Sequence, residues 1–201
     1  MSRGGLIAVV GPSGAGKDTL LDHARTALAG DDRIVFARRV ITRPCDGGTE
    51  DHDTLSVAEF DRAELSGAFS VAWSAHGLRY GLPSSLESQI AAGKVLIANV
   101  SRGVIPALRA AYPAVAVVEI TARPDILAAR LGARGRETQA EVEARLARTV
   151  AADHTAGAIV LDNSGAREIA GDRLIAIIRR MAAGQEMAGP EGHTPNSRRS
   201  Q

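Results

Sequence analysis

The feature that most constrains this sequence is a glycine-rich run placed between a short apolar segment and an amphipathic one. Residues 6–10 form a continuous apolar run, which is typical of a strand buried on both faces. Apolar side chains then recur at helical spacing, at Leu20, Leu21, Ala24, Ala27 and Leu28. The order of strand, glycine-rich turn and helix predicts a loop whose backbone N–H groups gather at a helix N-terminus.

The residues of this turn match the G-x-x-x-x-G-K part of the P-loop pattern. Glycines let backbone N–H groups approach phosphate oxygens closely, and Lys17 can reach the terminal phosphates of a nucleoside triphosphate. We therefore predict an ATP site, in preference to a glycine-rich turn without a ligand. The residues assigned to it are Gly11, Pro12, Ser13, Gly14, Ala15, Gly16, Lys17, Asp18 and Thr19.

One position departs from the usual pattern, in which a Ser or Thr hydroxyl that ligates magnesium follows the lysine. Here that residue is Asp18. A carboxylate suits Mg²⁺ as a ligand, either directly or through a water molecule, and Thr19 offers a hydroxyl nearby. Alternatively, Asp18 only favours the helix N-terminus electrostatically. Asp18 is thus the candidate metal residue, with both interpretations open.

The remaining pattern predicts an α/β fold in which a parallel sheet carries helices on both faces. Residues 43–50 have the composition of a loop, and residues 182–201 that of a disordered tail after a kinase domain at 1–181. Further strands are expected at residues 34–36, 95–100, 115–120 and 158–161. Further helices are expected at residues 125–131, 139–152 and 166–181, although Gly171 disfavours the last.

Composition limits the partners and the compartment. The 201 residues suit one domain, and a net charge of +1 gives no overall field for nucleic acid. Cys45 is the single cysteine, which fits a reducing compartment. The apolar run at residues 6–10 is too short for a signal peptide or a membrane span. We expect a cytoplasmic protein that binds no membrane.

Arginines gather in two parts of the chain. The first cluster is Arg38, Arg39 and Arg43, and the second is Arg130, Arg134, Arg136, Arg145 and Arg148. Each arginine alone is most simply a solvated surface residue. Two clusters beside a P-loop, however, suit transfer between two polyanions, because guanidinium groups neutralise and orient phosphates. No general base stands out, and none is needed if the acceptor is itself an ionised phosphate.

Several stretches together resemble a known family. They are Gly16-Lys17-Asp18, Arg39-Val40-Ile41-Thr42-Arg43, Glu50-Asp51-His52, Trp73-Ser74-Ala75-His76-Gly77-Leu78 with Tyr80-Gly81, and Arg134-Gly135-Arg136-Glu137. The sequence resembles the guanylate kinase superfamily, and within it the ribose 1,5-bisphosphate phosphokinases of phosphonate degradation. The resemblance implies ATP-dependent formation of phosphoribosyl diphosphate, an acceptor-binding insert around residues 38–83 and an arginine-rich lid around residues 132–145.

The resemblance also implies roles for single residues. Lys17, Arg134, Arg136 and Arg145 are expected to act on the transferring group, and Asn163 to lie where such kinases hold adenine. The sugar bisphosphate is expected to contact Arg39, Thr42, Arg43, Glu50, His52, Tyr80 and Arg102. His52 is equally well explained as an exposed loop histidine, and Trp73 is expected to belong to the core. The partner is then a sugar phosphate, and a homodimer is possible.

Three positions disfavour a true guanylate kinase. Ala72 and Asn99 stand where guanylate kinases carry acidic residues that accept from guanine, and Arg39 replaces a serine that contacts the base. A site that has lost hydrogen-bonding partners for a base loses discrimination steeply, and an added arginine suits a phosphate better. Asp46 replaces a second arginine of guanylate kinases, so the acceptor site must differ from theirs. GMP kinase remains the alternative enzyme, and a non-catalytic guanylate kinase-like module the alternative of another class.

Overall fold

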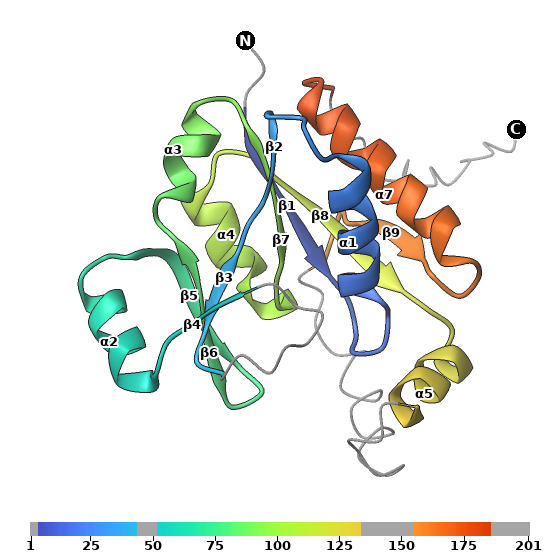
Figure 1. Cartoon of the computed structure of the whole chain (residues 1–201), viewed down its shortest axis with the longest axis horizontal. Coiled ribbons are helices and arrows are strands. Elements are labelled where there is room, and N and C mark those ends of the chain that lie inside the picture. Colours follow the sequence, from blue (N-terminus) through green and yellow to red (C-terminus); the bar gives the residue numbers. More distant parts are fainter. Residues whose placement is uncertain (1–3, 44–51, 134–154, 186–201) are drawn as a thin grey trace, which may run out of the picture.

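A five-stranded parallel sheet organises the computed structural model, which describes residues 4–43, 52–133 and 155–185 (Figure 1). The strand order β2-β7-β1-β8-β9 places the strand that precedes the P-loop at the centre. The strands are β1 Gly5–Val10, β2 Ile34–Phe36, β7 Val95–Asn99, β8 Val115–Thr121 and β9 Ile159–Asp162. All four pairings are parallel. The predicted α/β fold and the predicted strands are confirmed.

Both faces of the sheet are covered, as the continuous apolar run of β1 predicted. Ile7 and Val9 contribute to a core shared with α1 and α7, whereas the alternate residues Leu6 and Ala8 pack against α3 and α4. Figure 1 shows α1 and α7 together on one side of the sheet. The four helices are α1 Lys17–Ala27, α3 Leu86–Ala91, α4 Ile105–Ala111 and α7 Arg167–Ala182.

A second sheet of four strands occupies residues 39–83 and lies inside the stretch that the resemblance assigns to an acceptor-binding insert. Its order is β4-β3-β6-β5. The strands are β3 Arg39–Ile41, β4 His52–Thr54, β5 Phe69–Ala75 and β6 Leu78–Pro83. A tight turn with His76 and Gly77 at φ 52° and 74° joins β5 to β6. Helix α2, Val57–Leu65, covers this sheet and begins with a capping box between Ser56 and Glu59.

A short 3₁₀ turn and one further helix complete the described elements. The turn η1 spans Arg102–Val104, and α5 spans Pro124–Gly132, with its proline in the first turn and Arg130 reaching the P-loop. The helix expected at residues 139–152 and most of the expected lid lie outside the described residues. No described helix is long and apolar enough to cross a membrane.

Helix α7 confirms the helix expected at residues 166–181 and differs from expectation at its end. It continues through Gly171, where a glycine lets α7 approach α1 closely, because a Cβ there would lie 2.4 Å from His23 Cδ2 of α1. Ala182 was predicted to begin the tail, but it is the last residue of α7 and is buried. Its methyl group belongs to the core between α7 and the sheet. Of the tail expected at residues 182–201, residues 186–201 lie outside the described residues.

Candidate active site

The P-loop has the backbone that its glycines predicted. Gly11, Gly14 and Gly16 have φ values of 148°, 84° and 87°, in the region that L side chains rarely adopt. A Cβ on Gly11 would lie 2.1 Å from the carbonyl oxygen of Ile120 in β8. Leu20 donates its N–H to the Gly16 carbonyl, so the helix begins directly after the last glycine. The turn therefore presents the N-terminus of α1 to a ligand, as a phosphate site requires.

Lys17 lies back along this turn. Its Nζ donates to the carbonyl oxygens of Gly11 at 2.8 Å and Pro12 at 3.1 Å. These bonds keep the ammonium group at the mouth of the loop, where the positive end of α1 adds to its charge. The predicted role of Lys17 at the terminal phosphates of a nucleotide remains a prediction.

The rear of the loop is braced by residues far away in the sequence. Asn163 follows β9, is buried, and donates from Nδ2 to the Ala15 carbonyl at 2.8 Å. Arg130 of α5 donates to the Asn163 carbonyl at 2.9 Å and to the Gly14 carbonyl at 3.4 Å. Asn163 was predicted to lie near adenine, which remains a prediction. The bracing role of Arg130 was missed, since only the three-dimensional fold brings α5 to the loop.

Asp18 lies in the first turn of α1 and is half-buried. One of its carboxylate oxygens, Oδ1, accepts a hydrogen bond from Asn99 Nδ2 at 2.8 Å. Thr19, whose hydroxyl is the other candidate ligand for magnesium, is exposed. A single hard carboxylate beside a phosphate cradle fits Mg²⁺, which takes one or two carboxylates together with substrate phosphates and water. The residues present therefore fit the ion that the sequence analysis assigned to Asp18.

Arg39 brings the second sheet to the P-loop. Its side chain is only 8% exposed, and its guanidinium lies over the Tyr80 ring, 5.4 Å from the centroid. Burial lowers the pKa of Arg39 to about 10, the nearby Asp18 and Tyr80 oppose this shift, and Arg43 adds to it. Four predicted site residues, two of them arginines, are therefore close enough to interact: Asp18, Arg39, Arg43 and Tyr80.

The other predicted acceptor residues are placed differently. His52 is 5% exposed and stands beside Arg39 in the β3–β4 pairing, so its interpretation as an exposed loop histidine is wrong. Arg102 donates to Glu119 Oε1 at 2.6 Å in a pair that is largely buried. This pair joins the turn after β7 to β8 and directs Arg102 toward a carboxylate of the protein.

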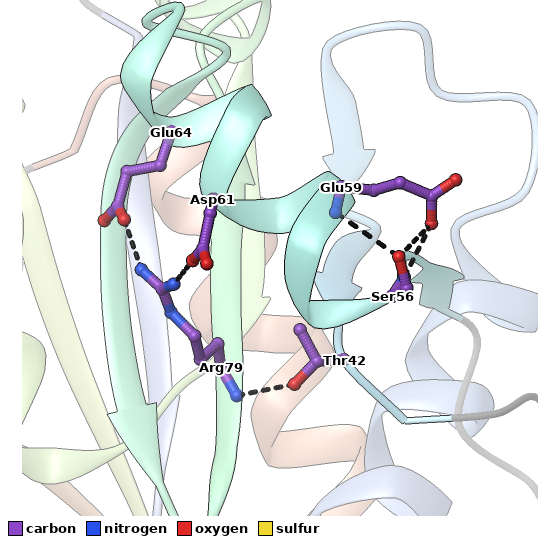
Figure 2. A network of polar contacts seen from close by, with 6 residues as sticks. All are labelled: Thr42, Ser56, Glu59, Asp61, Glu64 and Arg79. Atoms are coloured by element: carbon purple, nitrogen blue, oxygen red, sulfur yellow. Dashed lines mark hydrogen bonds and ion pairs between the residues drawn. The ribbon is translucent and has the colours of Figure 1, made fainter.

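Thr42 is held by the neighbouring strand. Its hydroxyl oxygen accepts from the N–H of Arg79 at 2.9 Å, and its own N–H donates to the Arg79 carbonyl at 3.1 Å. Figure 2 shows the Arg79 guanidinium reaching the opposite way, to Asp61 and Glu64 of α2. Arg79 thus connects α2 with the end of β3 that carries the predicted acceptor residues. The sequence analysis missed this role.

The aromatic pair of the second sheet has a packing role. Trp73 and Tyr80 are stacked with their centroids 5.4 Å apart, and Trp73 Nε1 donates to Ser101 Oγ at 3.1 Å. Trp73 also packs against the core on the α3–α4 side of the main sheet, as its prediction as a core residue required. Ala72, which precedes it, offers only a methyl group. The predicted residues Glu50, Arg134, Arg136 and Arg145 lie outside the described residues.

Comparison with solved structures supports the kinase fold. A guanylate kinase from Anaplasma phagocytophilum superposes with a TM-score of 0.63 at 21% identity, covering 96% of this chain and 92% of that one. A sugar kinase from Janibacter superposes with a TM-score of 0.52 at 18% identity. At these identities the likeness concerns the fold. The central P-loop strand, the strand order and the second sheet define a P-loop kinase with the guanylate kinase-like fold.

Relatives found by sequence identify the family more specifically than the solved structures do. A protein of Brucella melitensis named ribose 1,5-bisphosphate phosphokinase PhnN is 56% identical over 164 residues, which are 81% of this chain and 85% of that protein. The protein of the same name from Agrobacterium fabrum is 46% identical over 184 residues, or 90% of this chain and 100% of its own length. No protein-family model matches the chain. The chain belongs to the ribose 1,5-bisphosphate phosphokinase family.

Proposed function

We propose that this protein transfers the γ-phosphoryl group of ATP to ribose 1,5-bisphosphate and forms 5-phosphoribosyl 1-diphosphate and ADP. An oxygen of the 1-phosphate attacks the γ-phosphorus, and the bond from that phosphorus to the oxygen bridging to the β-phosphate breaks. Family membership supports this reaction, and so does one observation of the site: the buried Arg39 guanidinium lies close enough to the P-loop carboxylate of Asp18 to interact with it electrostatically.

The P-loop would hold the donor. Backbone N–H groups at the start of α1 face the phosphates, and Lys17 would move from the carbonyl oxygens of Gly11 and Pro12 to the terminal phosphates. Mg²⁺ at Asp18 would neutralise part of the phosphate charge. The braces from Asn163 and Arg130 keep the loop in its geometry, so that little reorganisation accompanies binding.

The second sheet would hold the acceptor. Arg39 and Arg43 provide two cations, Tyr80 provides a ring face and a hydroxyl beside Arg39, and Asp18 lies within electrostatic reach of Arg39. An ionised phosphate acceptor needs orientation and charge neutralisation and no general base. Arginine is suited to this task because its planar guanidinium binds two phosphate oxygens at once. A buried guanidinium is also partly stripped of water, which strengthens its attraction to a phosphate.

GMP is the alternative acceptor, and the residues around the predicted purine position disfavour it. Ala72 has no acceptor for guanine N–H groups, and the Asn99 side chain donates to Asp18. With its NH₂ group on Asp18, Asn99 keeps only a neutral oxygen as an acceptor, which holds guanine N–H groups less strongly than the missing carboxylate would. The third possibility, a binding module without chemistry, is disfavoured by the formed P-loop and by Lys17 at its mouth.

The test is an acceptor comparison with the purified full chain, ATP and Mg²⁺. Ribose 1,5-bisphosphate, ribose 5-phosphate and GMP are supplied separately, ADP release is followed, and the product is identified by phosphorus NMR. We expect a diphosphate signal only with the bisphosphate. ADP release with GMP and none with the bisphosphate would overturn the assignment. Absence of ATP binding in calorimetry would revive the non-catalytic module.

We also propose a compartment and a test of the assembly. ATP as phosphoryl donor and a single cysteine suit the cytoplasm. A homodimer is compatible with the sequence, and light scattering on the full chain decides it. A mass of 20.9 kDa would indicate a monomer, and twice that mass a dimer.

A further inference from the structure

Asn99 is the last residue of β7 and lies next to the P-loop strand. The two strands are parallel neighbours, with Asn99 opposite Val9 of β1. The Val100 N–H donates to the Val9 carbonyl at 2.9 Å, which fixes the backbone just beyond this position. From there the Asn99 side chain reaches across to α1 and donates to Asp18 Oδ1 at 2.8 Å. The contact joins residues 81 positions apart.

The chemistry of the pair fixes how the amide is turned. An ionised carboxylate can only accept hydrogen bonds, so the NH₂ group of Asn99 must face Asp18. This donation occupies Oδ1 and leaves Oδ2 of Asp18 with its lone pairs. It also holds the carboxylate in one rotamer, since both residues are half-buried and Asn99 projects from a fixed strand end. Asn99 is neutral, so it orients the carboxylate and leaves its charge intact.

The pair resembles the usual magnesium site of P-loop enzymes, except that the carboxylate and the neutral polar side chain have exchanged positions. In most P-loop enzymes a Ser or Thr hydroxyl follows the lysine, and a carboxylate at the end of a neighbouring strand completes the site. Here the carboxylate follows the lysine, as Asp18, and the neutral polar group stands at the strand end, as Asn99. Each arrangement contains one carboxylate and one neutral partner at the same two places.

We propose that Asn99 is a positioning residue that orients the Asp18 carboxylate for the Mg²⁺ ion of the bound nucleotide, and that residues 18 and 99 act as an exchanged pair. The inference rests on the use of Mg²⁺ and ATP in the proposed function and does not depend on the acceptor. Supporting residues of this kind typically change metal affinity by about 10- to 100-fold when removed.

The experiment measures ATP binding by calorimetry on the full chain, once with Mg²⁺ and once with EDTA. Asn99→Ala is expected to weaken binding of Mg²⁺–ATP by about tenfold and to leave binding of metal-free ATP within about twofold of wild type. The matched control is Gln89→Ala, which removes the same amide group from α3, before the opposite end of β7. It is expected to leave both affinities unchanged.

An exchange of the two residues provides the second test. Asp18→Ser alone is expected to weaken Mg²⁺–ATP binding by at least about tenfold. Adding Asn99→Asp is expected to restore most of the lost affinity, because the pair then has the arrangement common to P-loop enzymes. A double variant that binds Mg²⁺–ATP no better than Asp18→Ser would overturn the exchange. This test also decides the matter if Asn99→Ala does not fold.

The outcomes separate the positioning role from the proposed function. If Asn99→Ala weakens ATP binding equally with Mg²⁺ and with EDTA, Asn99 supports the loop rather than the metal. The inference then fails, while the result of the acceptor comparison still stands. If Asn99→Ala weakens Mg²⁺–ATP binding as expected but the wild type transfers no phosphoryl group to the bisphosphate, the proposed function is wrong and the positioning role of Asn99 stands.

Discussion

Replacing Gly16 with alanine tests whether the P-loop is held in place from behind. Gly16 is the residue before α1 and has a left-handed backbone, with φ 87° and ψ 23°. A Cβ on this residue would lie 2.5 Å from Asn163 Nδ2. The same Nδ2 donates to the Ala15 carbonyl, so Asn163 cannot move aside without losing that bond.

The loss in the free energy of unfolding caused by Gly16→Ala has two separable contributions. A left-handed backbone costs an alanine about 1 kcal/mol relative to glycine. Displacing Asn163 breaks a hydrogen bond between buried groups and leaves them unsatisfied, which costs about 2 kcal/mol more. We therefore expect Gly16→Ala to lower the free energy of unfolding by about 3 kcal/mol in total.

Gly30 offers a matched control for the first contribution. It has φ 93°, and nothing lies within 4 Å of the Cβ that an alanine would add. Gly30→Ala should therefore cost about 1 kcal/mol, the backbone part alone. In an Asn163→Ala background the obstacle is gone, and Gly16→Ala should cost about the same as the control, giving a coupling of about 2 kcal/mol.

Urea denaturation of the four variants measures these differences, and calorimetry with ATP shows their effect on the site. Gly16→Ala should also weaken ATP binding, because the displaced loop no longer directs its N–H groups at the phosphates. The reasoning is refuted if Gly16→Ala and Gly30→Ala destabilise the protein equally, or if the cost of Gly16→Ala is unchanged when Asn163 is absent.

Three further substitutions test the rest of the site. Arg39→Met should weaken bisphosphate binding at least about tenfold, because it removes a buried guanidinium that is placed to hold a phosphate, and calorimetry that showed the affinity of the wild type would contradict this. Arg79→Ala should lower the free energy of unfolding by about 1.5 kcal/mol, because it removes two ion pairs and the contact with Phe60. The exposed Arg123→Ala should lower it by less than about 0.5 kcal/mol, and equal urea midpoints for the two variants would contradict the anchoring role of Arg79. Lys17→Ala should reduce turnover at least about 100-fold with an unchanged circular dichroism spectrum, and normal turnover would exclude its role at the phosphates.

The sequence was informative where burial is continuous along the chain. The strand at residues 6–10 and its parallel neighbours are buried on both faces, so their apolar runs were visible without any knowledge of the fold. The glycines of the P-loop were likewise readable, since a left-handed backbone and close contacts restrict those positions to one residue type.

The second sheet was not readable in the same way. Strands β3 and β4 have three residues each, too few to show alternation, and they carry Arg39 and His52 at positions that are buried in the fold. Burial of such residues depends on a partner strand and on charges that come from elsewhere, Asp18 among them. For the same reason Arg130, taken alone, was most simply a solvated surface residue of the second arginine cluster, although it contacts a loop 116 residues away.

Position 99 shows how the metal site and the acceptor preference are connected. A guanylate kinase-like aspartate at this position would have to accept from guanine, whereas the residue found here must donate to Asp18. An aspartate cannot do both, because a second carboxylate against Asp18 would repel it. An amide can donate to Asp18 from Nδ2 and still accept at its oxygen, but it is neutral and holds the N–H groups of a base less strongly than a carboxylate does. Once the carboxylate is at position 18, the strand end carries a neutral side chain, and the charged acceptor for a base is lost at the same step. The buried Arg39, which interacts electrostatically with Asp18, then provides a cation where a base would need hydrogen-bonding partners. The exchange of charge between residues 18 and 99 therefore favours an acceptor recognised through its phosphates.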